Sequence, residues 1–122
     1  MSNLPFRPYT SVSPPTILWH GQSGVRYPFE LWPIGTVFRD HPGVYIFCKP
    51  AANGNWDAVY IGETKSFQSR LTDGLAQHHQ WVSIVHCGAS HLCVMHVPGG
   101  LTLRERIETD LRRHIKTPCN LQ

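Results

Sequence analysis

Two short strings, GVYIF at residues 43–47 and AVYIG at residues 58–62, decide the fold of this chain. Each is a run of aliphatic and aromatic residues of strand length, a composition typical of a buried strand. Between them lies Asn53-Gly54, the dipeptide most typical of a tight turn between two strands. The strings therefore predict a β-hairpin. Because side chains alternate along a strand, Tyr45 and Tyr60 each share a face with the glycine at the end of their own string.

The segments around the hairpin show both helical and strand patterns. Phe67, Leu71 and Leu75 recur at a spacing of four residues, which favours a helix over residues 66–77. Thr102 with Glu105 has the pattern of a capping box at the start of the last helix. The remaining predicted elements are a helical stretch at 80–85, a helix at 102–116 with an apolar stripe, a strand at 91–97, and an N-terminal hairpin at 17–32 in which Pro28 marks an edge strand.

These elements predict a single α/β (α+β) domain over residues 17–122. We expect a small, mainly antiparallel three-stranded sheet, formed by residues 43–49, 57–62 and 91–97 and flanked by helices. Residues 41–120 form the core of this domain, and the hairpin within residues 17–40 extends or caps it. The proline-rich residues 1–16 are predicted to be a flexible arm.

Composition narrows the class of protein. The chain has 122 residues, 41% of them hydrophobic, which excludes a coiled coil, a collagen-like chain and wholesale disorder. No window is apolar enough for a membrane span, and the first residues do not read as a secretory signal, so we expect a cytoplasmic protein without a membrane partner. The formal net charge is +3, and the surplus lies in residues 101–122, which is compatible with a phosphate-bearing partner.

The four cysteines have irregular spacings and form no Cys-x-x-Cys pair, which favours reduced thiols. A zinc site is the alternative, because five residues that can bind zinc lie close together in the sequence, namely His86, Cys87, His91, Cys93 and His96. Strand alternation is against it, because His91 and Cys93 would face one way and His96 the other.

Several chemistry-bearing residues follow the hairpin in a fixed order. After the GVY and YIG strings come Arg70 on the first helix, Glu108 on the last helix and Asn120 just beyond it. In that order the chain resembles the GIY-YIG nuclease family over residues 41–120. The resemblance implies a metal-dependent endonuclease that hydrolyses phosphodiester bonds in DNA. It implies Mg²⁺ (or Mn²⁺) as the cofactor, Glu108 as the metal ligand, and five catalytic residues, namely Tyr45, Tyr60, Arg70, Glu108 and Asn120.

The sequence departs from the family pattern at the position of the general base. Many members carry a lysine after the YIG glycine or a histidine four residues after the arginine, where this chain has Glu63 and Gly74. His78 and His79 are the nearest substitutes and have the right intrinsic basicity. We expect these histidines, together with Arg104 and Arg112 on either side of Glu108, to bind the nucleic acid.

Two other functions remain open at the level of sequence. One is a GIY-YIG-like module that binds nucleic acid but has weakened catalysis, and the other is a nuclease toxin or mobile-element effector. Structural roles also remain open for single residues. Glu108 could belong to a surface ion-pair ladder with Arg104 and Arg112, and Arg70 could pair with Asp73.

Overall fold

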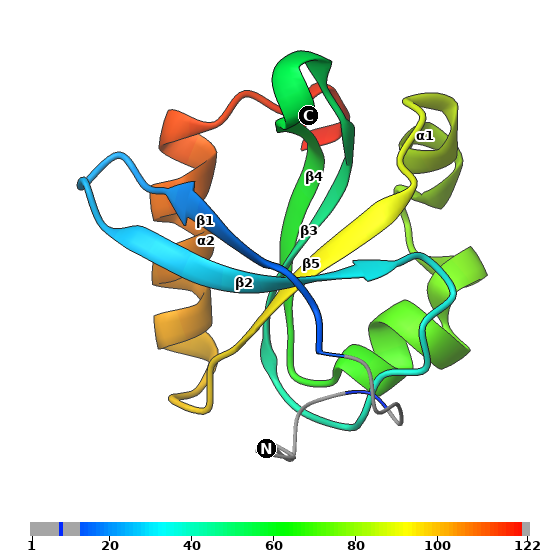
Figure 1. Ribbon diagram of the computed structural model, residues 1–122. Helices are drawn as coiled ribbons and strands as arrows, with labels where there is room; N and C mark the ends of the chain where they lie inside the picture. The colour runs from blue at the N-terminus through cyan, green and yellow to red at the C-terminus, as the bar shows by residue number, and fades with distance from the viewer. Residues whose placement is uncertain (1–7, 9–12, 121–122) are drawn as a thin grey trace.

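The computed structural model describes Pro8 and residues 13–120, so most of the predicted N-terminal arm lies outside the described residues. Five strands form one curled antiparallel sheet in the order β1-β2-β5-β3-β4 (Figure 1). They are β1 (Thr16–His20), β2 (Arg26–Pro33), β3 (Gly43–Pro50), β4 (Trp56–Thr64) and β5 (His91–His96). The helices are η1 (Ala52–Gly54), η2 (Gln68–Asp73), η3 (Leu75–Gln77), α1 (Trp81–His86), α2 (Leu101–His114) and η4 (Pro118–Asn120). The α+β class is confirmed.

The sheet has five strands, so the expectation of three was wrong. The N-terminal hairpin β1–β2 extends the sheet, because β2 pairs with β5 over residues 30–33. Pro28 therefore lies in an inner strand, and the prediction of an edge strand was also wrong. Pro28 pairs with Leu18 of β1 but precedes the ladder with β5, so its missing N–H does not interrupt that ladder.

The central hairpin is present as predicted, and its register is now defined. Tyr45 lies opposite Gly62 and Phe47 lies opposite Tyr60, so both tyrosines share one face of the sheet. Gly62 is required there, because a Cβ at this position would lie 2.5 Å from the Tyr45 hydroxyl oxygen. The glycine thus makes room for the phenol of the neighbouring strand.

Two of the predicted helix details need correction. The first helix ends early: the Gly74 N–H donates to the Ser69 carbonyl at 2.9 Å, five residues back, so η2 is a single π-helical segment and the short η3 follows it. Glycine is a poor helix former, which explains the break within the predicted range 66–77. The Thr102 cap was wrong as well. The last helix starts from Gly100, whose φ of 95° suits glycine, and Thr102 lies inside the first turn.

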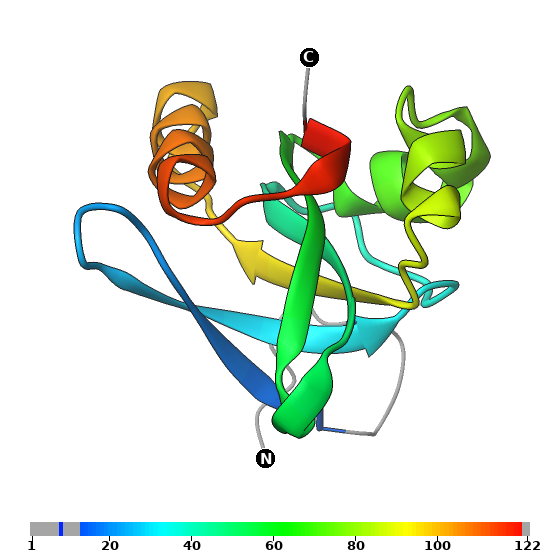
Figure 2. The same cartoon turned by 90° about the horizontal axis from the view of Figure 1, so that it is seen from above.

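Two apolar cores lie on opposite faces of the sheet. The first core packs β3 and β4 against η2, α1 and η4, and includes Tyr45, Phe47, Tyr60, Phe67, Leu71, Ile84 and Cys119. The second core packs the other face against α2, and includes Phe29, Val44, Ile46, Ile61, Cys93 and Leu111, with Ile107 and Ile115 at its border. Figure 2 shows α2 and the η2–α1 segment on either side of the central strands, with η4 between them.

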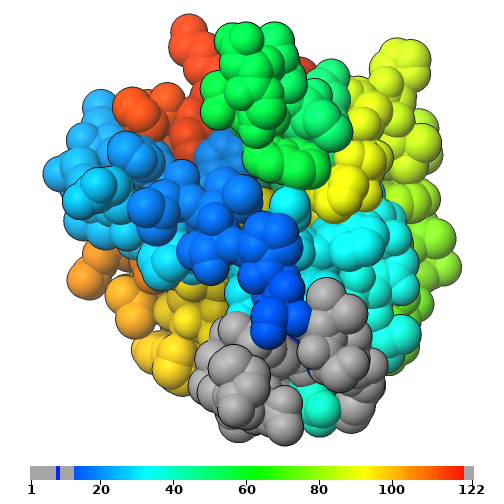
Figure 3. Space-filling model, viewed as in Figure 1, coloured from blue at the N-terminus to red at the C-terminus, as the bar shows by residue number. Residues whose placement is uncertain are grey.

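The N-terminal hairpin and the chain leading to β3 cover a large part of one side of the molecule, coloured blue to cyan in Figure 3. Because this hairpin closes the second core, its Phe29 is only 1% exposed. None of the helices in the described part of the chain is long and apolar enough to cross a membrane.

Candidate functional site

The Tyr45 hydroxyl is the centre of a polar cluster inside the first core. Its oxygen lies 2.7 Å from His78 Nε2 and 3.5 Å from a terminal nitrogen of Arg70. The backbone N–H of Gln80 donates to His78 Nδ1 at 3.1 Å. In the neutral ring, His78 therefore carries its proton on Nε2 and donates it to Tyr45. The Tyr45 oxygen accepts from two sides, and a side-chain hydrogen bond also links Tyr45 to Tyr60.

Burial sets the protonation states of this pair. It lowers the pKa of His78 to about 4, with smaller contributions from the charges of Arg70 and His79. Burial also raises the pKa of Tyr45 well above its usual value, and Tyr60 adds to that shift. At neutral pH the pair is therefore a neutral imidazole and a protonated phenol. Tyr45 is fully buried, which favours a role in orienting its neighbours over one as general base.

Tyr60 lies between the buried Tyr45 and the exposed His79. Its ring stacks on that of Tyr45 with centroids 6.2 Å apart, and its hydroxyl lies 3.5 Å from Nε2 of the exposed His79. The rings of His78 and His79 stack with centroids 4.9 Å apart. Burial raises the pKa of Tyr60, and the carboxylate of Glu108 raises it further. The two neighbouring histidines thus have different surroundings: His78 is buried and His79 faces solvent.

Glu108 approaches the cluster from α2. Its charge acts on both Tyr45 and Tyr60, although it belongs to a helix that packs on the other face of the sheet. This is possible because β4, which carries Tyr60, is the outer strand of the sheet and contacts α2. Burial raises the pKa of Glu108, Arg112 lowers it, and Glu63 raises it again. The Arg112 guanidinium lies 3.7 Å from the carboxylate.

Arg104 has a different partner from the one that helical spacing offers. It donates to Glu63 of β4 at 2.8 Å, and its side chain is 9% exposed. Arg112, in contrast, is 37% exposed beside Glu108. Of the two arginines predicted to bind nucleic acid, Arg112 is the one with an accessible guanidinium. The role of both in binding stays a prediction.

The structure thus brings together Tyr45, Tyr60, Arg70, His78, His79, Glu108 and Arg112, from β3, β4, η2, the η3–α1 loop and α2. Asn120 lies in η4, and its side chain is outside what the structure describes. Sequence reasoning missed Glu63 as the neighbour of both Arg104 and Glu108. Strand alternation could have indicated this contact. Glu63 is two residues from Ile61, so both side chains lie on the face of the sheet that packs against α2.

The fit of a divalent cation can be judged from Glu108. Within the described residues, no three histidine, cysteine or acidic side chains are placed to hold a metal ion together. Glu108 offers a single half-buried carboxylate whose pKa is raised by burial and by neighbouring carboxylates. A bound cation would favour the charged form of this carboxylate. Mg²⁺ can be bound by one carboxylate, with water molecules completing its coordination shell. A single carboxylate is thus compatible with Mg²⁺ or Mn²⁺, whereas the described residues do not provide the grouped ligands of a structural zinc site.

Comparisons of the chain with protein-family models, with curated proteins and with solved structures find no match.

Proposed function

We propose that this chain is a metal-dependent endonuclease that hydrolyses phosphodiester bonds in DNA, with a fold and site resembling those of the GIY-YIG nucleases. The observation that carries the proposal is the convergence of Arg70, Tyr60 and Glu108 on one cluster from three separate segments. Hydrolysis of a phosphodiester needs a cationic donor for the phosphate, a proton acceptor for water and a site for a divalent cation. The cluster contains a candidate for each.

Arg70 is the phosphate-binding group in this proposal. Its guanidinium is partly exposed, and its charge acts on Tyr45, Tyr60 and His78, which places it among the rings of the cluster. A planar guanidinium can donate two parallel hydrogen bonds to a phosphate. The Tyr45 hydroxyl, held by His78, accepts from Arg70 and orients it.

His79 is the candidate for accepting the proton of the attacking water, and Tyr60 is its neighbour in the cluster. His79 is exposed, whereas the Nδ1 of His78 is occupied by a backbone N–H. Imidazole has an intrinsic pKa near neutrality and is suited to this role. The Tyr60 hydroxyl lies 3.5 Å from His79 Nε2 and can relay a hydrogen bond to it.

Glu108 would hold the divalent cation. When bound, the cation polarises the phosphate and offsets the charge that develops on it. Arg112 lies beside the same carboxylate and can contact the nucleic-acid backbone.

One observation favours a second candidate function, a nucleic-acid-binding module without cleavage. The Tyr45 hydroxyl is fully buried, and Arg104 is engaged with Glu63, so two of the predicted site residues face the protein interior. A plasmid cleavage assay combined with a binding assay separates the two functions. A binding module would bind supercoiled DNA and leave it uncut.

The test is relaxation of a supercoiled plasmid by the full chain with Mg²⁺, Mn²⁺ or EDTA. We expect cleavage with either metal and none with EDTA. Glu108→Gln should abolish cleavage, whereas Glu105→Gln, which removes the same charge from an exposed position of the same helix, should retain it. Circular dichroism checks that both variants are folded. Wild-type cleavage by folded Glu108→Gln would contradict the site, and binding without cleavage by the wild type would favour the module.

A further inference from the structure

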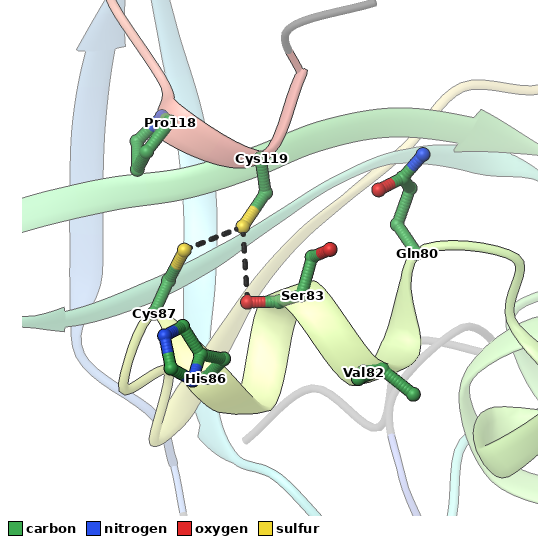
Figure 4. Close-up of a pocket in the computed structure, with 7 residues that line it drawn as sticks. All are labelled: Gln80, Val82, Ser83, His86, Cys87, Pro118 and Cys119. Carbon is green, nitrogen blue, oxygen red and sulfur yellow. Dashed lines mark hydrogen bonds between the residues drawn. The ribbon is translucent and has the colours of Figure 1, made fainter.

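The four cysteines form two thiol pairs with different surroundings. Cys48 and Cys93 lie on the paired strands β3 and β5, with their sulfur atoms 3.9 Å apart and no exposed surface. Cys87, at the end of α1, and Cys119, in η4, have their sulfur atoms 2.7 Å apart (Figure 4). The second pair joins segments that are distant in sequence, and its sulfur atoms are the closer ones.

Local hydrogen bonds orient the Cys87–Cys119 pair. The Cys119 thiol donates to the Ser83 carbonyl at 3.2 Å, so its hydrogen points away from Cys87. The Cys87 sulfur is the second polar contact of the Cys119 sulfur. Figure 4 shows both side chains pointing toward each other from facing elements. A disulfide has sulfur atoms about 2.05 Å apart, so closing the pair requires a movement of less than about an ångström.

The pair is also open to a reagent. It lies at a cavity of about 310 Å³ lined by Gln80, Val82, Ser83, His86 and Pro118 as well as the two cysteines. Val82 is 81% exposed, so this wall of the cavity faces solvent. Cys87 is half-buried and Cys119 is buried, so a reagent reaches Cys87 first.

We propose that Cys87 and Cys119 are a modification site, at which a low-molecular-weight disulfide such as oxidised glutathione converts the two thiols into one intramolecular disulfide. The bond ties η4 covalently to the end of α1. This proposal is independent of the nuclease proposal, because it rests on the two thiols and the cavity alone.

The reaction proceeds by two thiol–disulfide exchanges. The Cys87 thiolate attacks one sulfur of the oxidised reagent, which forms a mixed disulfide and releases one molecule of reduced thiol. The Cys119 thiolate then attacks the Cys87 sulfur, which forms the internal disulfide and releases the second reduced thiol. Two protons leave the protein, and two electrons pass from the cysteine pair to the reagent.

The surroundings assign the order of the two steps. Burial, together with the neighbouring Cys87, raises the pKa of Cys119 to about 12, whereas the Lys49 charge lowers it. Cys119 is therefore the poorer first nucleophile, and it becomes reactive once Cys87 presents a mixed disulfide beside it. The Lys49 ammonium is fixed nearby by its hydrogen bond of 2.9 Å to the Cys87 carbonyl.

The experiment incubates the reduced full chain with mixtures of oxidised and reduced glutathione, followed by rapid alkylation, intact mass measurement and peptide mapping. We expect a monomer lighter by two hydrogen atoms, with Cys87 linked to Cys119 and with Cys48 and Cys93 still reduced. The melting temperature of the oxidised form should rise by at least about 5 °C, because the bond constrains the unfolded chain. Reduction with dithiothreitol should reverse both changes.

Variants make the assignment specific. Cys119→Ser should stop the reaction at the mixed disulfide on Cys87, and Cys87→Ser should prevent both steps. Cys48→Ala is the matched control, because it removes one thiol of the sealed pair and should leave the Cys87–Cys119 link intact. A wild-type product that stays a mixed disulfide, links Cys48 to Cys93, or is a disulfide-bonded dimer would overturn the proposal. Mapping of the wild type alone decides this even if a variant does not fold.

Discussion

The two faces of the sheet are built from the same strands but end in different chemistry. On the face toward α2, β3 and β4 place Val44, Ile46 and Ile61 in a sealed apolar layer closed by Leu111. On the other face the same strands place Tyr45 and Tyr60, whose hydroxyls lead through His78 and His79 to solvent. The thiol pairs follow the same division, since the sealed pair lies in the second core and the open pair borders the first. Alternation along two strands thus separates an apolar core from a second core that contains polar side chains extending toward the surface.

The first prediction concerns the polar face. Arg70→Ala should lower the rate of DNA cleavage by about 10²–10³-fold, the scale for losing one donor that stabilises the transition state. Arg70→Lys should recover only part of the rate, because an ammonium cannot donate in parallel to two oxygens. Single-turnover cleavage of a plasmid measures the rate. Arg106→Ala, an exposed arginine on α2, is the control. An unchanged rate in folded Arg70→Ala would remove Arg70 from the site.

The second prediction concerns the apolar face. Leu111→Ala should lower the free energy of unfolding by about 3 kcal/mol, because it opens a cavity in a fully buried layer. Leu103 belongs to the same predicted apolar stripe of the last helix but is 37% exposed. Leu103→Ala should therefore lower the free energy of unfolding by well under half as much as Leu111→Ala. Denaturation in urea, followed by circular dichroism, measures both. Equal losses would mean that α2 packs along its whole stripe rather than through its C-terminal half.

The third prediction concerns the contact between the two strands. Gly62→Ala should lower the free energy of unfolding by about 1–3 kcal/mol, because its Cβ would overlap the Tyr45 hydroxyl. Tyr45→Phe in the same chain should recover only the part of that loss that is due to the oxygen, because the ring carbon Cζ would still lie 2.6 Å from the Cβ. Gly99→Ala is the control, because its Cβ meets only the flexible end of Leu103. If Tyr45→Phe makes the loss larger, the glycine serves another contact.

The sequence predicted the hairpin well because its signals are local. Both strings are continuous apolar runs, and the turn contains Asn53-Gly54. A period of two placed each tyrosine on the face of its own strand's glycine, but only the register places Tyr45 and Tyr60 on one face of the sheet. The five-stranded sheet was not predicted, because pairing of β2 with β5 joins segments about sixty residues apart and leaves no local pattern. The π-helical turn was missed because Gly74 interrupts an otherwise regular apolar spacing.

The sequence indicated some of the residues that lie together in the candidate site but not their contacts. The order of Tyr45, Tyr60 and Arg70 along the chain selected three members of one cluster. That His78 rather than His79 holds Tyr45 depends on the path of the η3–α1 loop, which no periodicity encodes. Similarly, helical spacing offered Glu108 as the partner of Arg104, but packing of α2 over β4 gives it Glu63.

The fourth prediction uses pH to distinguish the two neighbouring histidines. The pKa of His78 is lowered to about 4 in the folded protein, from an ordinary value of 6.5. The unfolded chain therefore binds a proton on this side chain more readily than the folded one. The associated stability is fully present above about pH 6.5 and is lost as the pH falls toward 4, by an amount on the order of 1–3 kcal/mol.

Urea denaturation at a series of pH values measures this effect as a difference between chains. His78→Gln should flatten the decline between pH 6.5 and 4 relative to wild type, whereas His79→Gln at the exposed position should follow the wild-type curve. A His78→Gln curve parallel to the wild type would show that the buried imidazole does not titrate differently in the two states.

The smallest expected effect lies on the surface of α2. Arg112 is 37% exposed beside Glu108, whereas Arg113 lies on another side of the helix, in a groove shared with Ser23 and Asp110. If DNA passes over Glu108, then Arg112→Ala should weaken binding by less than about tenfold and reduce the slope of log affinity against log salt by about 1. Arg113→Ala should leave that slope unchanged. Binding is measured with the uncleaving Glu108→Gln chain from low to physiological salt, which keeps the substrate intact.

Because only a few arginines border the cluster, the overall slope should be shallow, about −2 to −4, and far from the value near −10 of a protein with many phosphate contacts. Equal slope changes from Arg112→Ala and Arg113→Ala would place the DNA across α2 rather than along the side that carries Glu108.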